Sequence, residues 1–342
     1  MRPIVDNVRR TSSSRSLAEG SGSSVHNIDW FITVGGLFAG FMVGLTGMGG
    51  AVIVTPMLIF IFGIPAPIAV STDVVSAAVM KPVGAGVHLA RRTPHMRMVF
   101  WLCVGSIPGV LIGTLLFRQL VSAADGTTIL RSLVGVALLV GVVFTVVRLR
   151  LRKFAANSPR RAIYLSPRRR ALIAVIGLVV GTMVGITSVG SGTLISASLI
   201  VLYPAMLPSR LVGTDLVQAV PLLAVGALAH WGLGEIDWLV VAALLIGQIP
   251  GVWLGARVSS RYNGQALRYL LMVLVCAAGL ALLGTPPIAT GVITAVATVV
   301  IGVPVLVSYR REARAGALPA DAPEADMLDP GAPEADAPTR TQ

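Results

Sequence analysis

Apolar residues fill long, uninterrupted stretches of the chain and do not follow the spacing of a half-buried helix or strand. These stretches cover residues 30–62, 68–90, 98–117, 129–147, 171–203, 211–231, 238–256, 267–284 and 286–308. Because a helix of ~20 apolar residues can cross a bilayer, most of the stretches have the length of one membrane span. The pattern predicts an all-α, multi-pass membrane protein. Its expected location is the cell membrane, meaning the inner or plasma membrane.

Two of these stretches, 30–62 and 171–203, are too long for one simple span and contain clusters of glycine. The clusters read "GLTGMGG" (44–50) and "GITSVGS" (185–191). Glycine weakens a helix interior by ~1 kcal/mol, and it lets the backbone turn or approach a ligand closely. Each long stretch is therefore expected to form a hairpin of two short helices, broken at the glycines.

Related motifs occur twice along the chain, which indicates an internal repeat. "GLFAGFMVGLTGMGG" (36–50) aligns with "GLVVGTMVGITSVGS" (177–191) at an offset of 141 residues. At an offset of 142 residues, "STDVV" aligns with "GTDLV", and "VGSIPGVLIG" (104–113) aligns with "IGQIPGVWLG" (246–255). Many secondary transporters are built from two such repeats, with the substrate site between them near the bilayer midplane.

The charges of the connections predict that the two repeats are inverted. The connection after the second stretch contains Arg91, Arg92 and Arg97, whereas its counterpart carries Glu235 and Asp237. Cytoplasmic loops carry an excess of Lys and Arg, so these equivalent loops are expected on opposite sides of the membrane. Inversion also places the arginine-containing N-terminal arm outside, against the same rule. A parallel arrangement of full spans therefore stays open as the alternative.

The predicted organisation is a series of segments around the two repeats. It consists of a polar N-terminal arm (1–29), transmembrane repeat 1 (30–147), a basic cytoplasmic loop (148–170), transmembrane repeat 2 (171–284), an extra transmembrane helix (285–310) and a disordered acidic tail rich in Ala and Pro (311–342). The tail is assigned from its composition, which offers too little apolar surface for a packed core.

Composition narrows the expected partners. The chain is 55% hydrophobic and 12% charged, with a net charge of +12. Its basic residues lie mostly in short connections, so they report topology and do not indicate a nucleic-acid partner. Cys103 and Cys276 fall inside apolar stretches and predict packing, with no metal site, disulfide or cofactor. The expected partners are the lipid bilayer and a small-molecule anion, and a homodimer is left open.

The glycine clusters are the candidate binding site. A turn inside the membrane leaves backbone groups without partners, and the N–H groups at the start of the next half-helix suit an anion. The predicted substrate-binding residues are Thr46, Met48, Gly49, Gly50, Ala51, Thr187, Ser188, Gly190, Ser191, Gly192 and Thr193. Glycines spaced by four are instead predicted to allow close helix packing. They are Gly36, Gly40, Gly44, Gly105, Gly109, Gly113, Gly177, Gly181, Gly185, Gly247, Gly251 and Gly255.

Lys81 is a further candidate for contact with the anion, because it lies well inside the second apolar stretch. A lysine at the membrane centre costs ~3 kcal/mol on insertion scales and is expected to face a partner or a wet cavity. Asp73 lies two helical turns earlier on about the same face, so a buried Asp73–Lys81 pair is the alternative. Repeat 2 has Leu223 at the equivalent position.

Two aspartates and two histidines recur at equivalent positions of the repeats. Asp73 and Asp215 follow Thr72 and Thr214, where capping of a helix N-terminus is the favoured role. His88 and His230 lie near the other ends of those helices. One hypothesis is that these four residues couple transport to protons, since the imidazole of histidine titrates near neutral pH. For the histidines the alternative is an interfacial hydrogen bond.

These residues resemble the TauE/SafE family of sulfite and sulfonate exporters over about residues 30–310. The resemblance rests on "GLTGMGGAVIVTPML" and "GITSVGSGTLISASL", on "STD" and "GTD", and on "GVHLARRTPHMR" and "ALAHWGLGEIDW". The motifs are specific for the family but not for the substrate. Ala51 departs from the family pattern, which often has a third consecutive glycine there, and Ala197 stands opposite Pro56 of repeat 1.

The resemblance implies a secondary transporter that moves a small oxyanion such as sulfite or an organosulfonate. The chain has no nucleotide-binding motif, so ion gradients or the membrane potential are expected to drive transport. An integral membrane enzyme acting on a lipid phosphate would need clustered acids or metal ligands. The scattered carboxylates between residues 30 and 310 offer none, so the protein is not expected to be an enzyme. An anion channel stays open as an alternative.

Overall fold

A computed structural model describes residues 30–46, 50–155, 165–204, 206, 208–233, 236–259 and 265–298. The regular elements in these residues are helices, which confirms the predicted all-α class. The chain divides into two units after Thr294, and helices α1–α10 all lie in the first unit. Of the second unit, only residues 295–298 are described.

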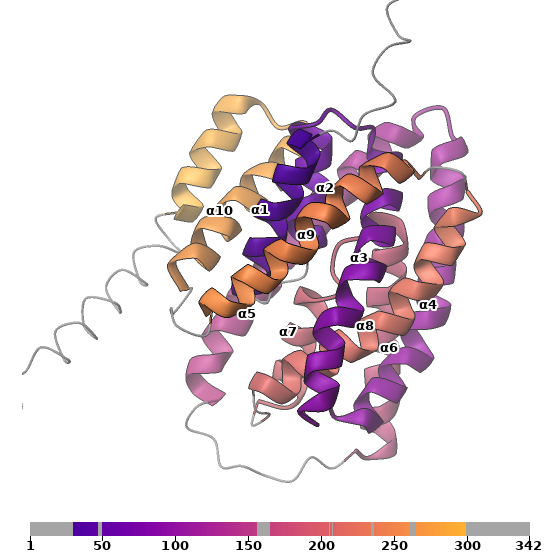
Figure 1. The fold of residues 1–342 in the computed structure, drawn as a ribbon, viewed down its shortest axis with the longest axis vertical. Coiled ribbons are helices and arrows are strands. Elements are labelled where there is room, and N and C mark those ends of the chain that lie inside the picture. The colour runs from indigo at the N-terminus through magenta and orange to yellow at the C-terminus, as the bar shows by residue number, and fades with distance from the viewer. Residues whose placement is uncertain are drawn as a thin grey trace, which may run out of the picture. The chain divides into compact units, whose positions relative to one another are not determined.

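The described helices α1–α10 are distributed over both halves of the chain (Figure 1). The first half of the chain forms α1 (Trp30–Thr46), α2 (Ala51–Phe60), α3 (Ala66–Ala90), α4 (Met96–Ser122) and α5 (Gly126–Ala155). The second half forms α6 (Pro167–Thr187), α7 (Thr193–Leu202), α8 (Pro208–Trp231), α9 (Trp238–Ser259) and α10 (Gln265–Leu282). Each of the two long apolar stretches is thus divided into a longer and a shorter helix at its glycine cluster.

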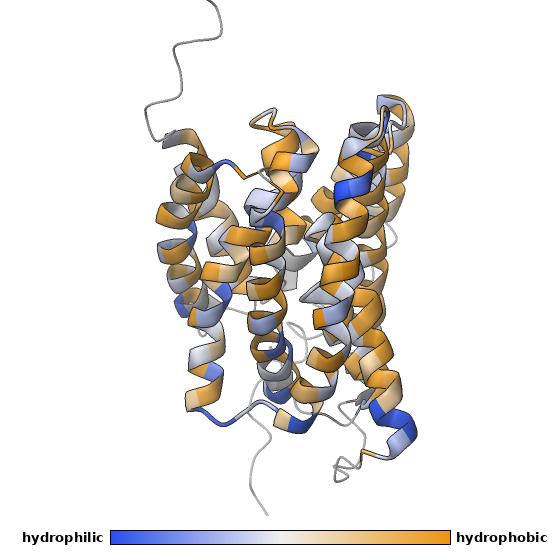
Figure 2. Cartoon of the chain, turned by 90° about the vertical axis from the view of Figure 1, so that its right-hand side faces the viewer, coloured by the Kyte–Doolittle hydropathy of each residue, from blue (hydrophilic) through white to orange (hydrophobic). Residues whose placement is uncertain are grey.

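Within the described residues, six helices are long and apolar enough to cross a membrane. They are α3, α4, α5, α6, α8 and α9, and the remaining helices are shorter. Large apolar side chains such as Phe100 and Leu228 point outward, as expected for surfaces that face lipid. Figure 2 shows apolar residues along the length of the helices and hydrophilic residues gathered toward their ends. The protein is a multi-pass membrane protein.

Several predicted segments lie partly or wholly outside the described residues. These include the N-terminal arm (1–29) and the acidic tail (311–342), while the extra span is described only as helix Pro287–Thr298. In the region of the predicted basic loop (148–170), α5 continues to Ala155 and α6 begins at Pro167. The Ser166 hydroxyl accepts a hydrogen bond from the N–H of Arg169, and Pro167 suits the first helical position, so both residues favour an early start of α6.

Regularly spaced glycines bring two pairs of helices into backbone contact. A Cβ atom on Gly40 of α1 would lie 2.4 Å from the carbonyl oxygen of Gln248 on α9. A Cβ atom on Gly181 of α6 would lie 2.3 Å from the carbonyl oxygen of Ser106 on α4. No side chain fits at such distances, so the predicted packing role is confirmed for Gly36, Gly40, Gly105, Gly109, Gly113, Gly177, Gly181, Gly185, Gly247, Gly251 and Gly255. For Gly44 it stays a prediction.

The order of these contacts gives the relative directions of the packed helices. Successive glycines of α9 meet successive carbonyls of α1, and α4 and α6 show the same order, so both pairs run parallel. The contacts are Gly247–Thr33, Gly251–Leu37 and Gly255–Phe41, and Gly105–Ala174, Gly109–Leu178 and Gly113–Thr182. Helices α3 and α8 cross antiparallel, since Gly84 meets Leu216 and Gly226 meets Val74.

Hydrogen bonds between helix starts show which helices begin on the same side. The N–H of Asp237, before α9, donates to Thr72 near the start of α3. The N–H of His95, before α4, donates to Thr214 near the start of α8 at 2.9 Å. Helices α1, α3 and α9 therefore run in one direction, and α4, α6 and α8 run in the other. Because α1 and α3 run the same way, the short helix α2 between them must turn back.

One end of the helices is strongly basic. The starts of α4, α6 and α8 and the ends of α3 and α9 carry Arg91, Arg92, Arg97, Arg168, Arg169, Arg170, Arg210 and Arg257. In the described residues of the other end, Arg118 and Arg131 accompany Asp125 and Asp237. The positive-inside rule assigns the basic end to the cytoplasm.

Cysteine labelling tests this orientation in a background that carries Cys103→Ala and Cys276→Ala. Gly232→Cys, at the exposed end of α8, should react with an impermeant maleimide added outside intact cells. Ser209→Cys, exposed at the start of α8, should react only after the membrane is permeabilised. The reverse pattern would contradict the assignment of the basic end to the cytoplasm.

Candidate substrate site

The second glycine cluster forms a tight turn between α6 and α7. Ser188 ends α6 in the left-handed conformation with φ 61°, and Gly190 has φ 118°, which side chains rarely allow. Gly192 is the N-cap of α7, and Thr193 is its first residue. The turn thus places the start of α7 inside the bundle, with the buried hydroxyl of Ser191 beside it.

Thr187 stabilises this turn through its own backbone. Its hydroxyl donates to the carbonyl oxygen of Met183 at 2.8 Å and accepts from the N–H of Val189 at 3.3 Å. Both contacts are local, so the hydroxyl of Thr187 is already engaged within the turn that breaks the helix between α6 and α7, which is called the second break below.

The first glycine cluster is described only at its end. Three of the predicted residues of this break lie outside the described side chains: Thr46, Met48 and Gly49. Gly50 is the N-cap of α2, and Ala51 is its first residue. A Cβ atom on Gly50 would lie 3.3 Å from the methyl group of Met80, so an apolar side chain covers this break.

The start of α7 offers hydrogen-bond donors besides the N–H of Leu194, which already donates to the carbonyl oxygen of Gly190 at 3.1 Å. The first N–H groups of any helix have no partner within that helix. The Thr193 hydroxyl is 2% exposed and, in the described part of the chain, makes no hydrogen bond. It lines a narrow cavity together with Val52 and Ile53 of α2 and Gly141 of α5, so the starts of both half-helices approach the same place. The volume of about 10 Å³ means that an anion can enter only if these helices move apart.

The ammonium group of Lys81 reaches the same break from α3. Its side chain is 5% exposed, and Nζ donates a hydrogen bond to the hydroxyl of Ser191. Its charge also interacts with the carboxylates of Asp215 and Asp73. A buried ammonium is tolerated when it faces polar partners. The Lys81 ammonium therefore donates a hydrogen bond to the second break and is attracted by the charges of two carboxylates.

Asp73 does not cap a helix, so the favoured sequence interpretation was wrong. Helix α3 begins at Ala66, about two turns before Asp73, and Pro65 is its N-cap. The buried carboxylate accepts hydrogen bonds from Thr55 at 2.6 Å and from Ser188 at 2.9 Å. Asp73 thus ties α2 and the second break to α3.

Asp215 has the same position in α8 and does not cap that helix either. Helix α8 begins at Pro208, also about two turns earlier. The carboxylate accepts a hydrogen bond from Ser196 of α7 through Oδ2 at 3.0 Å. Its other oxygen, Oδ1, is buried and has no hydrogen-bond partner among the described residues. Asp73 therefore accepts two hydrogen bonds, both through Oδ2, whereas Asp215 accepts one through Oδ2 and has a buried Oδ1 without a partner among the described residues.

His230 is fully buried near the end of α8. Nε2 lies 2.9 Å from the carbonyl oxygen of Gly185, and Nδ1 lies 3.0 Å from the hydroxyl of Ser71. A carbonyl oxygen can only accept, so Nε2 carries a hydrogen, and the neutral ring can accept from Ser71 at Nδ1. Both nitrogens are satisfied in the neutral ring.

His88 lies at the opposite end of the α3–α8 pair and is half-buried. Its Nδ1 lies 2.9 Å from the hydroxyl of Thr93, and a Cβ atom on Gly213 would lie 3.1 Å from the same nitrogen. The structure therefore brings together Lys81, the two aspartates and the second break. The side-chain hydrogen bonds described for the two histidines go to Ser71, Gly185 and Thr93 and not to these residues. Proton coupling by the histidines stays a hypothesis.

Sequence reasoning missed the hydroxyls that hold the two carboxylates. Thr55 and Ser196 are polar residues in short apolar helices, and they occupy equivalent positions at the offset of 141 residues. That coincidence was a usable signal. Gln218 was also missed: its amide nitrogen donates to Ser106 at 2.8 Å, while its Oε1 is buried without a partner in the described region, as is Oε1 of Gln248.

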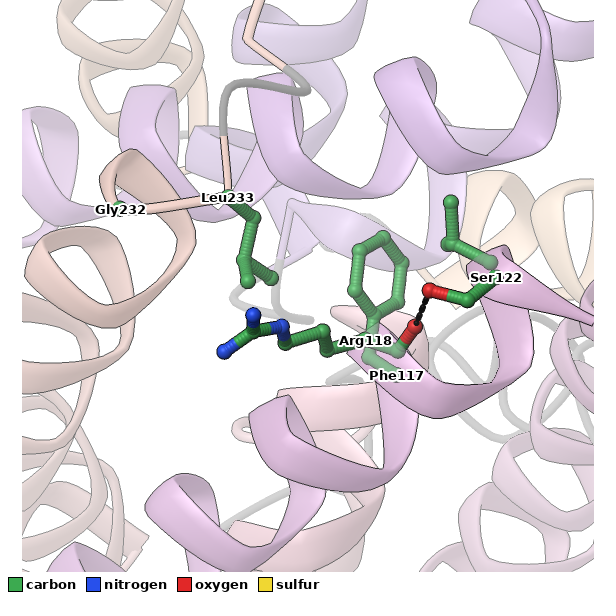
Figure 3. Close-up of a pocket in the computed structure, with 6 residues that line it drawn as sticks. Phe117, Arg118, Ser122, Gly232 and Leu233 are labelled. Carbon is green, nitrogen blue, oxygen red and sulfur yellow. Dashed lines mark hydrogen bonds between the residues drawn. The ribbon is translucent and has the colours of Figure 1, made fainter.

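A larger hollow lies at the end of the helices opposite the basic end. Its volume is about 240 Å³, and it is lined by Phe117, Arg118, Val121, Ser122, Gly232 and Leu233. Figure 3 shows the guanidinium group of Arg118 extending toward Leu233, and the hydroxyl of Ser122 donating to the Arg118 carbonyl. The Phe117 ring, which lines the hollow, contacts His230 with 4.7 Å between the ring centroids, and His230 in turn contacts Ser71.

Broken helices and buried charges inside a bundle of apolar helices define a membrane transport protein. The family model "Sulfite exporter TauE/SafE" matches residues 32–282. The chain belongs to the TauE/SafE family of membrane transporters, as its motifs predicted.

Curated relatives agree with this assignment. The chain is 36% identical over 252 residues to the probable membrane transporter protein YjnA of Bacillus subtilis, and the match covers 72% of the chain and 97% of the relative. It is 26% identical over 244 residues to YdhB of the same organism, covering 71% and 96%. A probable membrane transporter protein of Xylella fastidiosa is 24% identical over 239 residues, covering 68% and 86%. No solved structure matches the chain.

Proposed function

We propose that the protein is a secondary transporter of a small oxyanion, such as sulfite or an organosulfonate. In this proposal the anion binds beside Lys81 at the start of α7. The observation that carries it is the hydrogen bond from the buried Lys81 ammonium to Ser191, two residues before Thr193, whose hydroxyl has no hydrogen-bond partner among the described residues. A cation, a hydroxyl donor and the positive end of a half-helix together suit an oxyanion.

The two breaks are proposed to contribute unequally. Lys81 faces the second break, whereas the methyl group of Met80 covers Gly50 at the first. Leu223, at the position equivalent to Lys81, is 1% exposed and offers no charge. The binding residues are therefore expected to come mainly from Ser188, Gly190, Ser191, Gly192 and Thr193. Thr46, Met48, Gly49, Gly50 and Ala51 are then expected to shape the opposite wall.

We infer that the two halves are inverted copies. Equivalent contacts support this relation, since Thr55–Asp73 corresponds to Ser196–Asp215. Equivalent helices also run in opposite directions, as with α1 and α6. In transporters with inverted repeats, one half moves against the other around a fixed site. Such a motion would open the narrow cavity at Thr193.

The family description supports sulfite as the substrate, and a sulfonate presents the same three oxygens on sulfur. Ion gradients or the membrane potential are proposed to drive transport. The family model is named for an exporter, and the direction of net flux in this proposal follows from the gradients across the membrane.

Substitution of Thr193 tests the proposed site in proteoliposomes that contain purified protein. Thr193→Val keeps the side-chain shape and removes the hydroxyl, and it should raise the sulfite or sulfonate concentration for half-maximal flux about tenfold, because a hydrogen bond to a charged group contributes about 1.5–3 kcal/mol. Thr114→Val is the matched control. The hydroxyl of Thr114 is buried but donates to Val110 in its own helix.

Equal effects of the two substitutions would contradict a site at the start of α7.

Labelled anion should also accumulate transiently against unlabelled anion inside the vesicles. This counterflow requires a carrier that binds on alternate sides, so its absence in the presence of flux would favour a channel.

A further inference from the structure

The two recurring aspartates are not equivalent in their surroundings. Asp73 receives hydrogen bonds from two hydroxyls, Thr55 and Ser188. Asp215 receives one hydrogen bond, from Ser196, and its Oδ1 is buried without a partner in the part of the chain that the structure describes. An unpartnered buried oxygen on an ionised carboxylate is costly, and a bound proton removes that charge.

The neighbouring charges determine what Asp215 can bind. Lys81 of α3 and Arg148 of α5 both interact with its charge. Two cations nearby oppose the entry of a metal cation, which would also need several oxygen ligands. A proton needs a single lone pair. The environment of Asp215 therefore favours a proton over a metal ion.

The other titratable groups on the helices that pack against α8 are less suited to exchange a proton at this point. Besides Lys81, α3 carries Asp73 and His88, and α4 carries Arg97, Cys103 and Arg118, with His95 as its N-cap. Burial, together with Arg210 and Arg97, lowers the pKa of His95, so its imidazole is neutral near pH 7. The thiol of Cys103 points to the carbonyl oxygen of Gln218, and α7 contributes hydroxyls.

We propose that Oδ1 of Asp215 binds a proton that crosses the membrane together with the anion, and that Asp73 does not take part in this exchange. The proposal rests on the transport function proposed above. When Asp215 is ionised, its carboxylate attracts Lys81. When a proton adds to Oδ1, Asp215 becomes neutral and the Lys81 cation is free to bind the anion beside Ser191. No other bond is made or broken, and the proton leaves from the same oxygen.

Gradient-driven uptake in proteoliposomes tests the proposal. With the outside more acidic by about one pH unit, the wild-type protein should accumulate labelled sulfite about tenfold, and a protonophore should abolish this. Asp215→Asn should lose the accumulation but keep measurable anion counterflow. Asp215→Glu should retain the response to the gradient. Every variant is assayed with the same anion, so protonation of the anion itself affects all the variants equally.

Asp73→Asn is the matched control. Its anion accumulation should still respond to the pH gradient, even if its transport rate is lower than that of the wild-type protein. The proposal would be overturned if Asp215→Asn still accumulated the anion, or if both asparagine variants lost accumulation equally. It would also be overturned if a sodium gradient could replace the proton gradient in the wild-type protein. Counterflow without any response of the wild-type protein to the pH gradient would also overturn it while leaving the transport function intact. Absence of both counterflow and uptake in the wild-type protein would count against the transport function itself.

Discussion

Lys81→Met should reduce anion flux by about 100-fold, because truncating one partner of a buried hydrogen-bonded charge pair costs about 2–5 kcal/mol. The ammonium group of Lys81 is a buried cation that donates a hydrogen bond to Ser191 of the second break. Methionine keeps most of the side-chain length and removes both the charge and the donors. Flux into proteoliposomes, normalised to inserted protein, measures the effect.

Two further variants separate anion contact from a purely structural role of Lys81. Lys81→Arg keeps the charge but changes the donor geometry, so it should retain part of the flux. The double variant Lys81→Met with Asp215→Asn removes both a cation and a carboxylate, so thermal stability should recover relative to Lys81→Met alone. Flux should not recover with it. Recovery of both properties would mean that Lys81 serves only to balance Asp215.

Gly181→Leu should prevent stable folding, because a Cβ atom on Gly181 would lie 2.3 Å from the carbonyl oxygen of Ser106. Backbone on both sides leaves no flexible atom to move aside. Overpacking of a core typically costs about 1–3 kcal/mol, and here the whole α4–α6 contact must separate, so the loss should exceed that range. The yield of monodisperse protein in detergent and its thermal unfolding midpoint measure the effect.

Gly86→Leu is the matched control for the glycine experiment. Gly86 also lies inside a long helix, but it is exposed, and a Cβ atom there would meet nothing within 4 Å. This variant should fold with an unchanged midpoint. If both leucine variants fold equally well, α4 and α6 are not in the backbone contact described here.

The long apolar stretches predicted the all-α membrane fold, and the regular spacing of glycines predicted which helix faces pack closely. Side-by-side backbones require small residues at one face of each helix, so a glycine at every fourth position is readable without a structure. The partners of those glycines were not readable. Contacts such as Gly40 with Gln248 join segments far apart in the chain, and only the directions of α1 and α9 place them together.

The role of the aspartates could not be predicted from "STD" and "GTD" alone. A Ser/Thr–Asp pair before an apolar run resembles a helix start, but the apolar residues from Ala66 to Val70 already form the first turn of α3. The carboxylate of Asp73 is therefore buried among hydroxyls from other helices. Lys81 was identified because charge is rare in a membrane span, and its partner Ser191 lies on a different half of the chain.

Equilibrium binding of labelled sulfite to the purified protein in detergent tests the proposed anion site without any dependence on gradients or orientation. The wild-type protein and Thr114→Val should bind sulfite saturably, with competition by sulfonates. Lys81→Met should bind about 100-fold more weakly, because it loses a buried charge contact. Unchanged affinity in Lys81→Met would contradict an anion site between Lys81 and the start of α7.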